Sequence, residues 1–259
     1  MTDRDQPVPV EDTEKRSLDL RSMTAARVSL GRFGAGQPTK VQLAFLMDHA
    51  RAREAVWSGM DRHGLSQRLK SMGLGAIEVA SLAEDRGTYV RRPDLGRQLS
   101  GPSVDLLRSV RPESGDIFDV VIVVADGLSS NAVEINATPL IEALQTRLKE
   151  LNLSLAPIVL AENARVALAD PVGEALGAKL SIILIGERPG LSAADSLGAY
   201  VTYEPRSGTP DSRRNCISNI RDGGMSVASA ADAITALVKA MMQTGISGVA
   251  LRDAAALLG

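Results

Sequence analysis

The sequence predicts an α/β fold: a parallel, Rossmann-like sheet flanked by helices, with a smaller, mainly helical N-terminal region. Near-continuous apolar runs occur at residues 117–125, 157–161 and 180–185, as expected for strands buried on both faces. Segments with helical apolar spacing lie between these runs. Strands that alternate with helices are joined by right-handed crossovers and therefore form a parallel sheet.

The domain organisation follows from where this pattern begins. Residues 113–259 carry the alternating pattern, and residues 21–112 carry a mixed, mainly helical one. Residues 1–20 are polar and have too little apolar surface to offset the entropy of ordering them. We therefore expect a flexible N-terminal arm followed by two regions.

Composition limits the class of protein. The chain of 259 residues can bury a sizeable core, and its 29 basic and 31 acidic residues give no broad attraction for nucleic acid or an anionic membrane. A single cysteine excludes an intrachain disulfide, and no apolar run reaches the ~18 residues of a membrane span. We expect a soluble, cytoplasmic protein without a metal site.

The first helix is predicted to begin at a capping box formed by Thr39 and Gln42. Its apolar face would carry Leu43, Leu46, Ala50 and Trp57. The other face is charged, and it suits either solvent or a subunit contact: Asp48, His49, Arg51, Arg53 and Glu54.

The rest of the N-terminal region carries weaker signals. A helix start is expected within residues 61–66, short strands at 76–81 and 88–90, and a helix at 102–111. Three arginines could clamp an anion or a partner's carboxylate, although solvated arginines are the commoner case: Arg91, Arg92 and Arg97.

Caps and breakers locate the helices of the second half. Thr138 followed by Pro139 predicts one helix start, and Asp170 followed by Pro171 predicts another, for a helix that ends at Gly177. Further elements are a strand at 199–203, a loop rich in hydrogen-bonding side chains at 211–221 and a final helix at 226–242.

Three chemically different turns directly follow predicted strands, at residues 126–129, 162–166 and 186–188. Ligands of open α/β sheets bind beyond the carboxyl ends of the strands. We therefore expect these turns to lie along one edge, where they could form the floor of a broad ligand site. Alternatively, their glycines only turn the chain, and Glu187 pairs with Arg188 or another arginine nearby.

Motifs for self-contained chemistry are missing from the sequence. It contains no G-x-S-x-G, no H-E-x-x-H and no Cys-His cluster, which disfavours a hydrolase or a metalloenzyme. The glycine-rich loop at 31–36 departs from a phosphate loop, because Gln37 and Pro38 stand where lysine is required. A nucleotide-dependent enzyme that uses this loop remains an alternative.

Several longer strings resemble the small subunit of ethanolamine ammonia-lyase. In the second half these strings are IGERPGLS, DSLGAY and RNCISNIR. Earlier in the chain they are TAARVSLGR, DHARAR, YVRRPDLGRQL and VVADGLSSNAV, so the resemblance covers about residues 24–245. Each string is more specific than a general fold signature.

The resemblance implies a function for the whole assembly. It implies a hetero-oligomer that depends on adenosylcobalamin and converts ethanolamine to acetaldehyde and ammonia by a radical mechanism. The large subunit would bind ethanolamine and carry the radical chemistry. The small subunit would close over the cobalamin and contribute no catalytic residue.

The resemblance also implies which residues contact cobalamin. Matched motif by motif, these positions fall on Val166, Glu187 and Cys216. Val166 would pack against the macrocycle, Glu187 would accept hydrogen bonds from corrin carboxamides, and Cys216 would permit close approach to the ring. The alternatives are core packing for Val166 and a buried structural thiol for Cys216. A non-catalytic cofactor-binding or regulatory module would share the same sheet edge.

Location is a separate question. Small subunits of this family can carry an N-terminal amphipathic helix that directs them to a bacterial microcompartment. The apolar spacing of such a helix is missing from residues 1–20. We therefore expect a cytoplasmic protein and leave encapsulation open.

Overall fold

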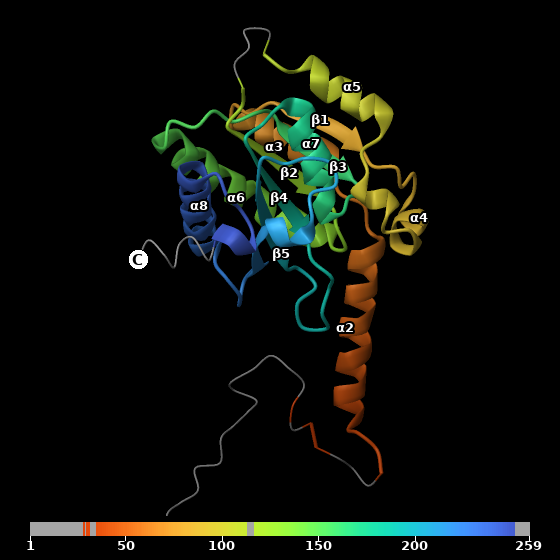
Figure 1. Cartoon of the computed structure of the whole chain (residues 1–259). Coiled ribbons are helices and arrows are strands. Elements are labelled where there is room, and N and C mark those ends of the chain that lie inside the picture. Colours follow the sequence, from red (N-terminus) through yellow and green to blue (C-terminus); the bar gives the residue numbers. More distant parts are fainter. Residues whose placement is uncertain (1–27, 29, 32–34, 113–116, 252–259) are drawn as a thin grey trace, which may run out of the picture. The chain divides into compact units, whose positions relative to one another are not determined.

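The computed structural model describes residues 28, 30–31, 35–112 and 117–251 (Figure 1). The predicted arm at 1–20 and part of the glycine-rich loop at 31–36 lie outside the described residues. By its contacts the chain divides into two units, Met1–Leu46 and Met47–Gly259, and the sheet belongs to the second. The predicted domain boundary near residue 113 stays a prediction.

A single six-stranded sheet forms the centre of this unit (Figure 1). The neighbouring strands β1, β3, β2 and β4 are parallel to one another. Strand β5 runs antiparallel to β4, and β6 runs antiparallel to β5. The predicted α/β class is confirmed, with two antiparallel strands added at one side of the parallel sheet. In the spatial order of the sheet the strands are β1 (Ala76–Ala80), β3 (Ile158–Glu162), β2 (Val120–Ala125), β4 (Leu180–Gly186), β5 (Leu197–Tyr203) and β6 (Asn215–Ile220).

Helices cover both faces of the sheet, which explains the uninterrupted apolar strands. In β2 all six residues are buried, and successive side chains enter opposite core clusters. Val120, Ile122 and Val124 belong to one cluster, Val121 and Val123 to the other. The first cluster includes residues of α3 (Arg62–Ser71), α6 (Ser130–Glu150) and α8 (Val227–Thr244), and the second residues of α5 (Gly101–Ser109) and α7 (Ala169–Leu176).

Several predicted helix ends are confirmed by their caps. The side chain of Asp61 accepts a hydrogen bond from the amide of Gly64 at the start of α3, and Ser226 caps α8 in the same way. Gly177, with φ 72°, ends α7. The helix predicted from the capping box is α2 (Thr39–Trp57). No described helix is long and apolar enough to cross a membrane.

The helix predicted to begin at Thr138 begins earlier, because Ser129 is its cap. Ser129 Oγ accepts a hydrogen bond from the amide of Ala132, and α6 then continues through Pro139. Pro139 removes the hydrogen bond to the carbonyl of Ile135. Both residues are exposed, so that carbonyl can bond to water and the helix need not end.

Two further predictions were wrong because an aspartate side chain makes an interaction that the prediction did not include. Residues 88–90, predicted as a strand, belong to α4 (Arg86–Arg91), because Asp85 caps a helix there by accepting from the amide of Thr88. Asp170 is not a cap but lies inside α7, buried in an ion pair with Arg214.

The segment predicted as a loop at 211–221 contains a strand. A short 3-10 helix, η3 (Asp211–Arg213), leads into β6, whose residues pair with β5. Two other 3-10 helices, η1 (Leu95–Arg97) and η2 (Val166–Leu168), lie in the connections after α4 and β3. Cys216 therefore lies on a sheet strand, where pairing holds its backbone in place.

The three predicted turns lie together at the carboxyl edge of the parallel strands. Gly127 has φ 54°, and the amide of Leu128 donates to the carbonyl of Gly186 over 2.9 Å. A Cβ on Gly186 would lie 2.0 Å from the backbone oxygen of Ser129. Both glycines are therefore required for the two backbones to approach closely at this edge.

We predict that Gly186→Ala lowers the free energy of unfolding by about 1–3 kcal/mol or more, because the added methyl group would meet backbone that cannot rotate away. Thermal unfolding followed by circular dichroism measures the change. The matched control is Gly101→Ala at the start of α5, where no atom lies within 4 Å of the added Cβ. Equal melting temperatures for the two variants would contradict the prediction.

Candidate functional site

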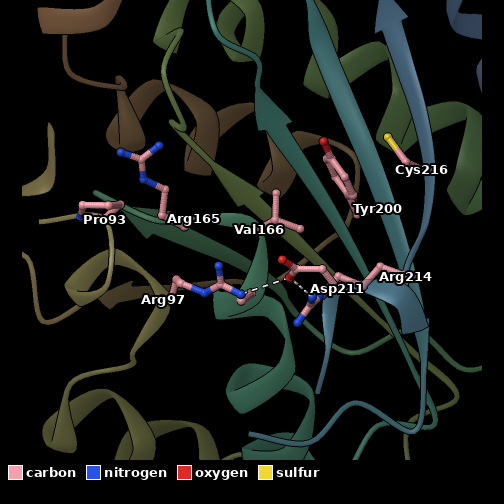
Figure 2. A pocket seen from close by; sticks show the side chains of 9 residues that line it. Pro93, Arg97, Arg165, Val166, Tyr200, Asp211, Arg214 and Cys216 are labelled. Carbon is pink, nitrogen blue, oxygen red and sulfur yellow. Dashed lines mark hydrogen bonds and ion pairs between the residues drawn. The ribbon is translucent and has the colours of Figure 1, made fainter. Parts of the chain in front are cut away.

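Two cavities adjoin at the carboxyl edge and form one open groove, which we call the edge groove. The first has a volume of about 480 Å³ and the second about 380 Å³. Arg165, Val166 and Tyr200 line both cavities, so the two are continuous. Figure 2 shows the first cavity, lined also by Pro93, Arg97, Ala167, Asp211, Arg214 and Cys216.

The three residues predicted to contact a cofactor come together in this groove. Val166 is the first residue of η2, directly after the turn that follows β3, and lines both cavities. Glu187 follows β4 and lines the second cavity. Cys216 lies on β6 and lines the first. Their contact with a cofactor stays a prediction, but no large movement is needed to bring them to one ligand.

Glu187 is held in place by hydrogen bonds to one of its two carboxylate oxygens. Ser196 Oγ donates to Oε2 over 2.5 Å, and the amide of Asn219 donates to the same atom over 3.3 Å. The alternative ion pair with Arg188 is not formed, and Glu187 forms no ion pair with any other described residue. A Cβ on Gly198 would lie 3.0 Å from Oε1, so the glycine makes room for this carboxylate against β5.

Cys216 and Tyr200 are cross-strand partners on neighbouring strands, and Figure 2 shows them side by side in the groove. Cys216 is exposed, so the alternative of a buried structural thiol is wrong. The groove walls still desolvate the thiol in part and raise its pKa; the neighbouring hydroxyl of Tyr200 opposes this shift. Desolvation, and then the neighbouring thiol, raise the pKa of Tyr200 as well.

A buried carboxylate fixes the turn that carries Val166. Asp126 is 1% exposed and accepts hydrogen bonds from the amides of Asn163 and Ala164, at 3.0 and 3.1 Å. Arg86 forms an ion pair with the same carboxylate at 2.9 Å. Burial raises the pKa of Asp126, and the Arg86 charge and the two amides oppose that shift. This one side chain thus ties β2, the β3–η2 turn and α4 together.

Arg165 is oriented by stacking against a tyrosine. The guanidinium groups of Arg165 and Arg86 both lie over the ring of the fully buried Tyr89, at 4.2 and 4.7 Å from the ring centroid. Tyr89 also donates its hydroxyl to the carbonyl of Ala164 over 3.1 Å. Arg165 therefore has a fixed position at the junction of the two cavities.

An ion-pair network forms one wall of the first cavity. Arg214 pairs with Asp170 and with Asp211, and it donates to the carbonyl of Thr209 over 2.8 Å. Asp211 pairs in turn with Arg97 at 3.0 Å (Figure 2). This wall is polar and held by charge, whereas Val166 gives the opposite part of the lining an apolar surface.

Arg91, Arg92 and Arg97 are all exposed, in agreement with the commoner case expected for them, solvated arginines, rather than with the alternative of an anion clamp. Arg92 pairs with its neighbour Asp94 at 2.7 Å, and Arg91 donates to the carbonyl of Gly87. Only Arg97 of the three lines the edge groove, and it is paired with Asp211. Within the described residues, no group of three or more His, Cys, Asp or Glu side chains could hold a metal ion.

Sequence reasoning missed three residues of the groove: Arg165, Tyr200 and Arg214. Tyr200 could have been found from alternation, because Ala199 and Val201 on either side of it are apolar and buried. Arg165 directly precedes Val166 in a turn already singled out. Arg214 lies in the segment at 211–221 already singled out, but its pairing had no local signal, because its partner Asp170 lies 44 positions away.

Comparison with known proteins decides the family. The family described as "Ethanolamine ammonia-lyase light chain (EutC)" matches residues 14–252. This chain belongs to that family. Within it, the ethanolamine ammonia-lyase small subunit of Azotobacter vinelandii is 48% identical over 94% of this chain and 90% of its own length. The protein of the same name from Ralstonia nicotianae is 46% identical over 98% and 94%, respectively.

Membership of the ethanolamine ammonia-lyase light-chain family extends over the whole edge groove. The small subunit of Pseudomonas aeruginosa, 45% identical, likewise covers 97% of this chain and 92% of its own length. The resemblance deduced from short strings is thereby confirmed. Because the shared name designates a small subunit, the family functions with a larger one.

The raised pKa of Cys216 predicts slow alkylation despite its exposure. The thiolate is the reactive form, so iodoacetamide should react several-fold more slowly with the folded chain than with the denatured chain at pH 8, and the rate should rise with pH. Tyr200→Phe should slow the reaction further, because it removes the hydroxyl that lowers the thiol pKa. Mass spectrometry follows the adduct. A folded chain that reacts as fast as the denatured one would contradict a raised pKa.

Proposed function

We propose that this chain is the small subunit of an adenosylcobalamin-dependent ethanolamine ammonia-lyase and that its edge groove closes over the cobalamin. The enzyme would convert ethanolamine to acetaldehyde and ammonia, with substrate held by a larger subunit. The observation that carries the proposal is the meeting of Val166, Glu187 and Cys216 in one groove. The names of the relatives support the substrate, and the groove supports the cofactor.

The residues of the groove fit a corrin. Its peripheral carboxamides need both donors and acceptors: Arg165 supplies donors, and Glu187 supplies an acceptor, because both described hydrogen bonds of its side chain go to Oε2. Val166 offers an apolar contact. Two open cavities of about 480 and 380 Å³ can cover only part of so large a molecule, which leaves the remainder for the larger subunit.

When bound, adenosylcobalamin supplies the radical that begins the reaction by removing hydrogen from ethanolamine. The described residues of this chain bind and orient. Asp126 and the stacked pair of Tyr89 and Arg165 hold the turn rigid, so that Val166 meets the ring with little loss of conformational entropy on binding. Glu187 and Arg165 fix the position of the ring through its amides.

The thiol of Cys216 and the phenol of Tyr200 are unsuited to acid-base or nucleophilic chemistry near pH 7. Desolvation raises the pKa values of Cys216 and Tyr200, so both are protonated near pH 7. Asp126 is buried beneath the turn and already accepts three hydrogen bonds. The radical chemistry and the ethanolamine pocket therefore belong to the larger subunit.

We predict that the purified chain alone does not release ammonia from ethanolamine in the presence of adenosylcobalamin, and that activity appears when the larger subunit is added. Coupled measurement of acetaldehyde tests this. Turnover by the single chain would contradict the division of labour. A complex that binds cobalamin yet leaves ethanolamine unchanged would instead favour a non-catalytic cofactor-binding module.

Glu187→Gln should weaken cobalamin binding to the complex by at most about 1.5–3 kcal/mol, because it replaces a charge-assisted hydrogen bond by a neutral one. Spectroscopic titration with cobalamin measures the loss. The matched control is Glu142→Gln on α6, an exposed glutamate outside the groove. If both variants bind cobalamin like the wild type, Glu187 does not contact the cofactor.

Cys216→Phe should prevent cobalamin retention, because the groove cannot accept the added volume without strain of roughly 1–3 kcal/mol or more. Cys216→Ala should be mild. Cobalamin retained during gel filtration of the complex is the measurement, with the melting temperature of each variant as the check on folding. Full retention by a folded Cys216→Phe complex would remove Cys216 from the site.

A further inference from the structure

A third cavity beside the edge groove concentrates positive charge. It has a volume of about 350 Å³, and none of its lining residues is acidic. We call it the basic pocket. It adjoins the second cavity of the groove, with which it shares Leu128, Arg165 and Arg188, and its lining is completed by His49, Ala52, Arg53, Val56, Val90 and Pro189.

The three arginines of the basic pocket lack a carboxylate partner. Arg53, Arg165 and Arg188 form no ion pair with any residue that the structure describes, in contrast to Arg86 and Arg214 nearby, which are paired. They come from separate elements, namely α2, the β3–η2 turn and the loop after β4. Like charges gathered around one cavity repel each other, and an anion placed between them removes that repulsion.

An exposed aromatic side chain lies next to this charge. Trp57 is 55% exposed at the end of α2, and it lies four residues after Arg53, so the two share one face of the helix. Arg53 and Arg188 are exposed as well. Tryptophan and arginine are the residue types that most often dominate the binding energy of protein interfaces.

We propose that the basic pocket and Trp57 form a docking surface for the larger subunit, in which carboxylate side chains of that subunit enter the pocket and an apolar patch covers Trp57. The proposal rests on the proposed function, because it takes the larger subunit as the partner. The unpaired positive charge of the pocket, which carboxylates would complement, and the continuity of the pocket with the edge groove support it. A protein surface is favoured over a small anion, because exposed arginines hold a free ion weakly and Trp57 needs an apolar partner.

The test compares two double charge reversals in the full chain. Arg53→Glu/Arg188→Glu reverses the pocket, whereas Arg206→Glu/Lys239→Glu reverses two exposed cations elsewhere and changes net charge equally. Association with the purified larger subunit is measured by sedimentation without cofactor, at low and at high salt. We expect the pocket variant to bind about tenfold or more weakly and the control to bind like the wild type.

Two companion variants support the test. Trp57→Ala should weaken association at both salt concentrations, because the lost contact is apolar. If the charge reversal does not fold, Arg53→Gln/Arg188→Gln replaces it, since it removes the charge and introduces no repulsion. High salt should weaken wild-type association and reduce the difference between wild type and pocket variant, because exposed charges are screened.

Wild-type association by the folded pocket variant would overturn the proposal. Association unchanged together with loss of phosphate-induced thermal stabilisation would overturn it in favour of a small-anion site. Failure of the proposed function looks different: the wild-type complex would assemble in a salt-dependent way and lose affinity on charge reversal, but it would not bind cobalamin.

Discussion

The candidate site depends on the ion pair and the hydrogen bonds of one buried carboxylate, that of Asp126. Placing a charge in the interior of a protein is costly unless it is paired and its remaining lone pairs are satisfied. Here Arg86 supplies the opposite charge, and the amides of Asn163 and Ala164 supply hydrogen bonds. Because these three donors belong to α4 and the β3–η2 turn, satisfying one buried group fixes the relative positions of three elements.

Tyr89 extends this arrangement to the surface. Its ring contacts the guanidinium groups of both Arg86 and Arg165. Arg86 is committed to the buried carboxylate, and Arg165 lines the cavities. The stacking also keeps Arg165 in place without a carboxylate partner among the described residues. In the proposed function, a donor with a fixed position would meet the amide groups of the cofactor at little cost in conformational entropy.

The two antiparallel strands explain why a groove exists beside the parallel sheet. Ala199 and Val201 of β5 pack into the core cluster that includes α6 and α8, so Tyr200 between them faces the opposite side. On that side Cys216 is exposed, and the cavity wall is built from the Asp211–Arg214 segment and Arg97. Strand pairing therefore supplies a rigid floor, and the helices of the parallel part supply its edge.

Much of the fold was determined by local sequence. Apolar runs marked the strands β2, β3 and β4, short polar side chains marked the starts of α3 and α8, and turn residues after the strands located the edge where Val166 and Glu187 lie. Such signals suffice because each arises from contacts within a few residues or from the burial of a whole strand.

Other features were decided by the tertiary structure, because they depend on contacts between residues far apart in the chain. Ser129 starts α6 ahead of Pro139, and the carbonyl that Pro139 leaves unbonded belongs to Ile135, an exposed residue. Asp170 lies within α7 because it forms a buried ion pair with Arg214. Residues 215–220 form a strand because they pair with β5. The groove belongs to this second class. Its cavities, the unpaired charge of Arg165 and the partial desolvation of Cys216 arise from segments far apart in the chain, so only folding brings them together.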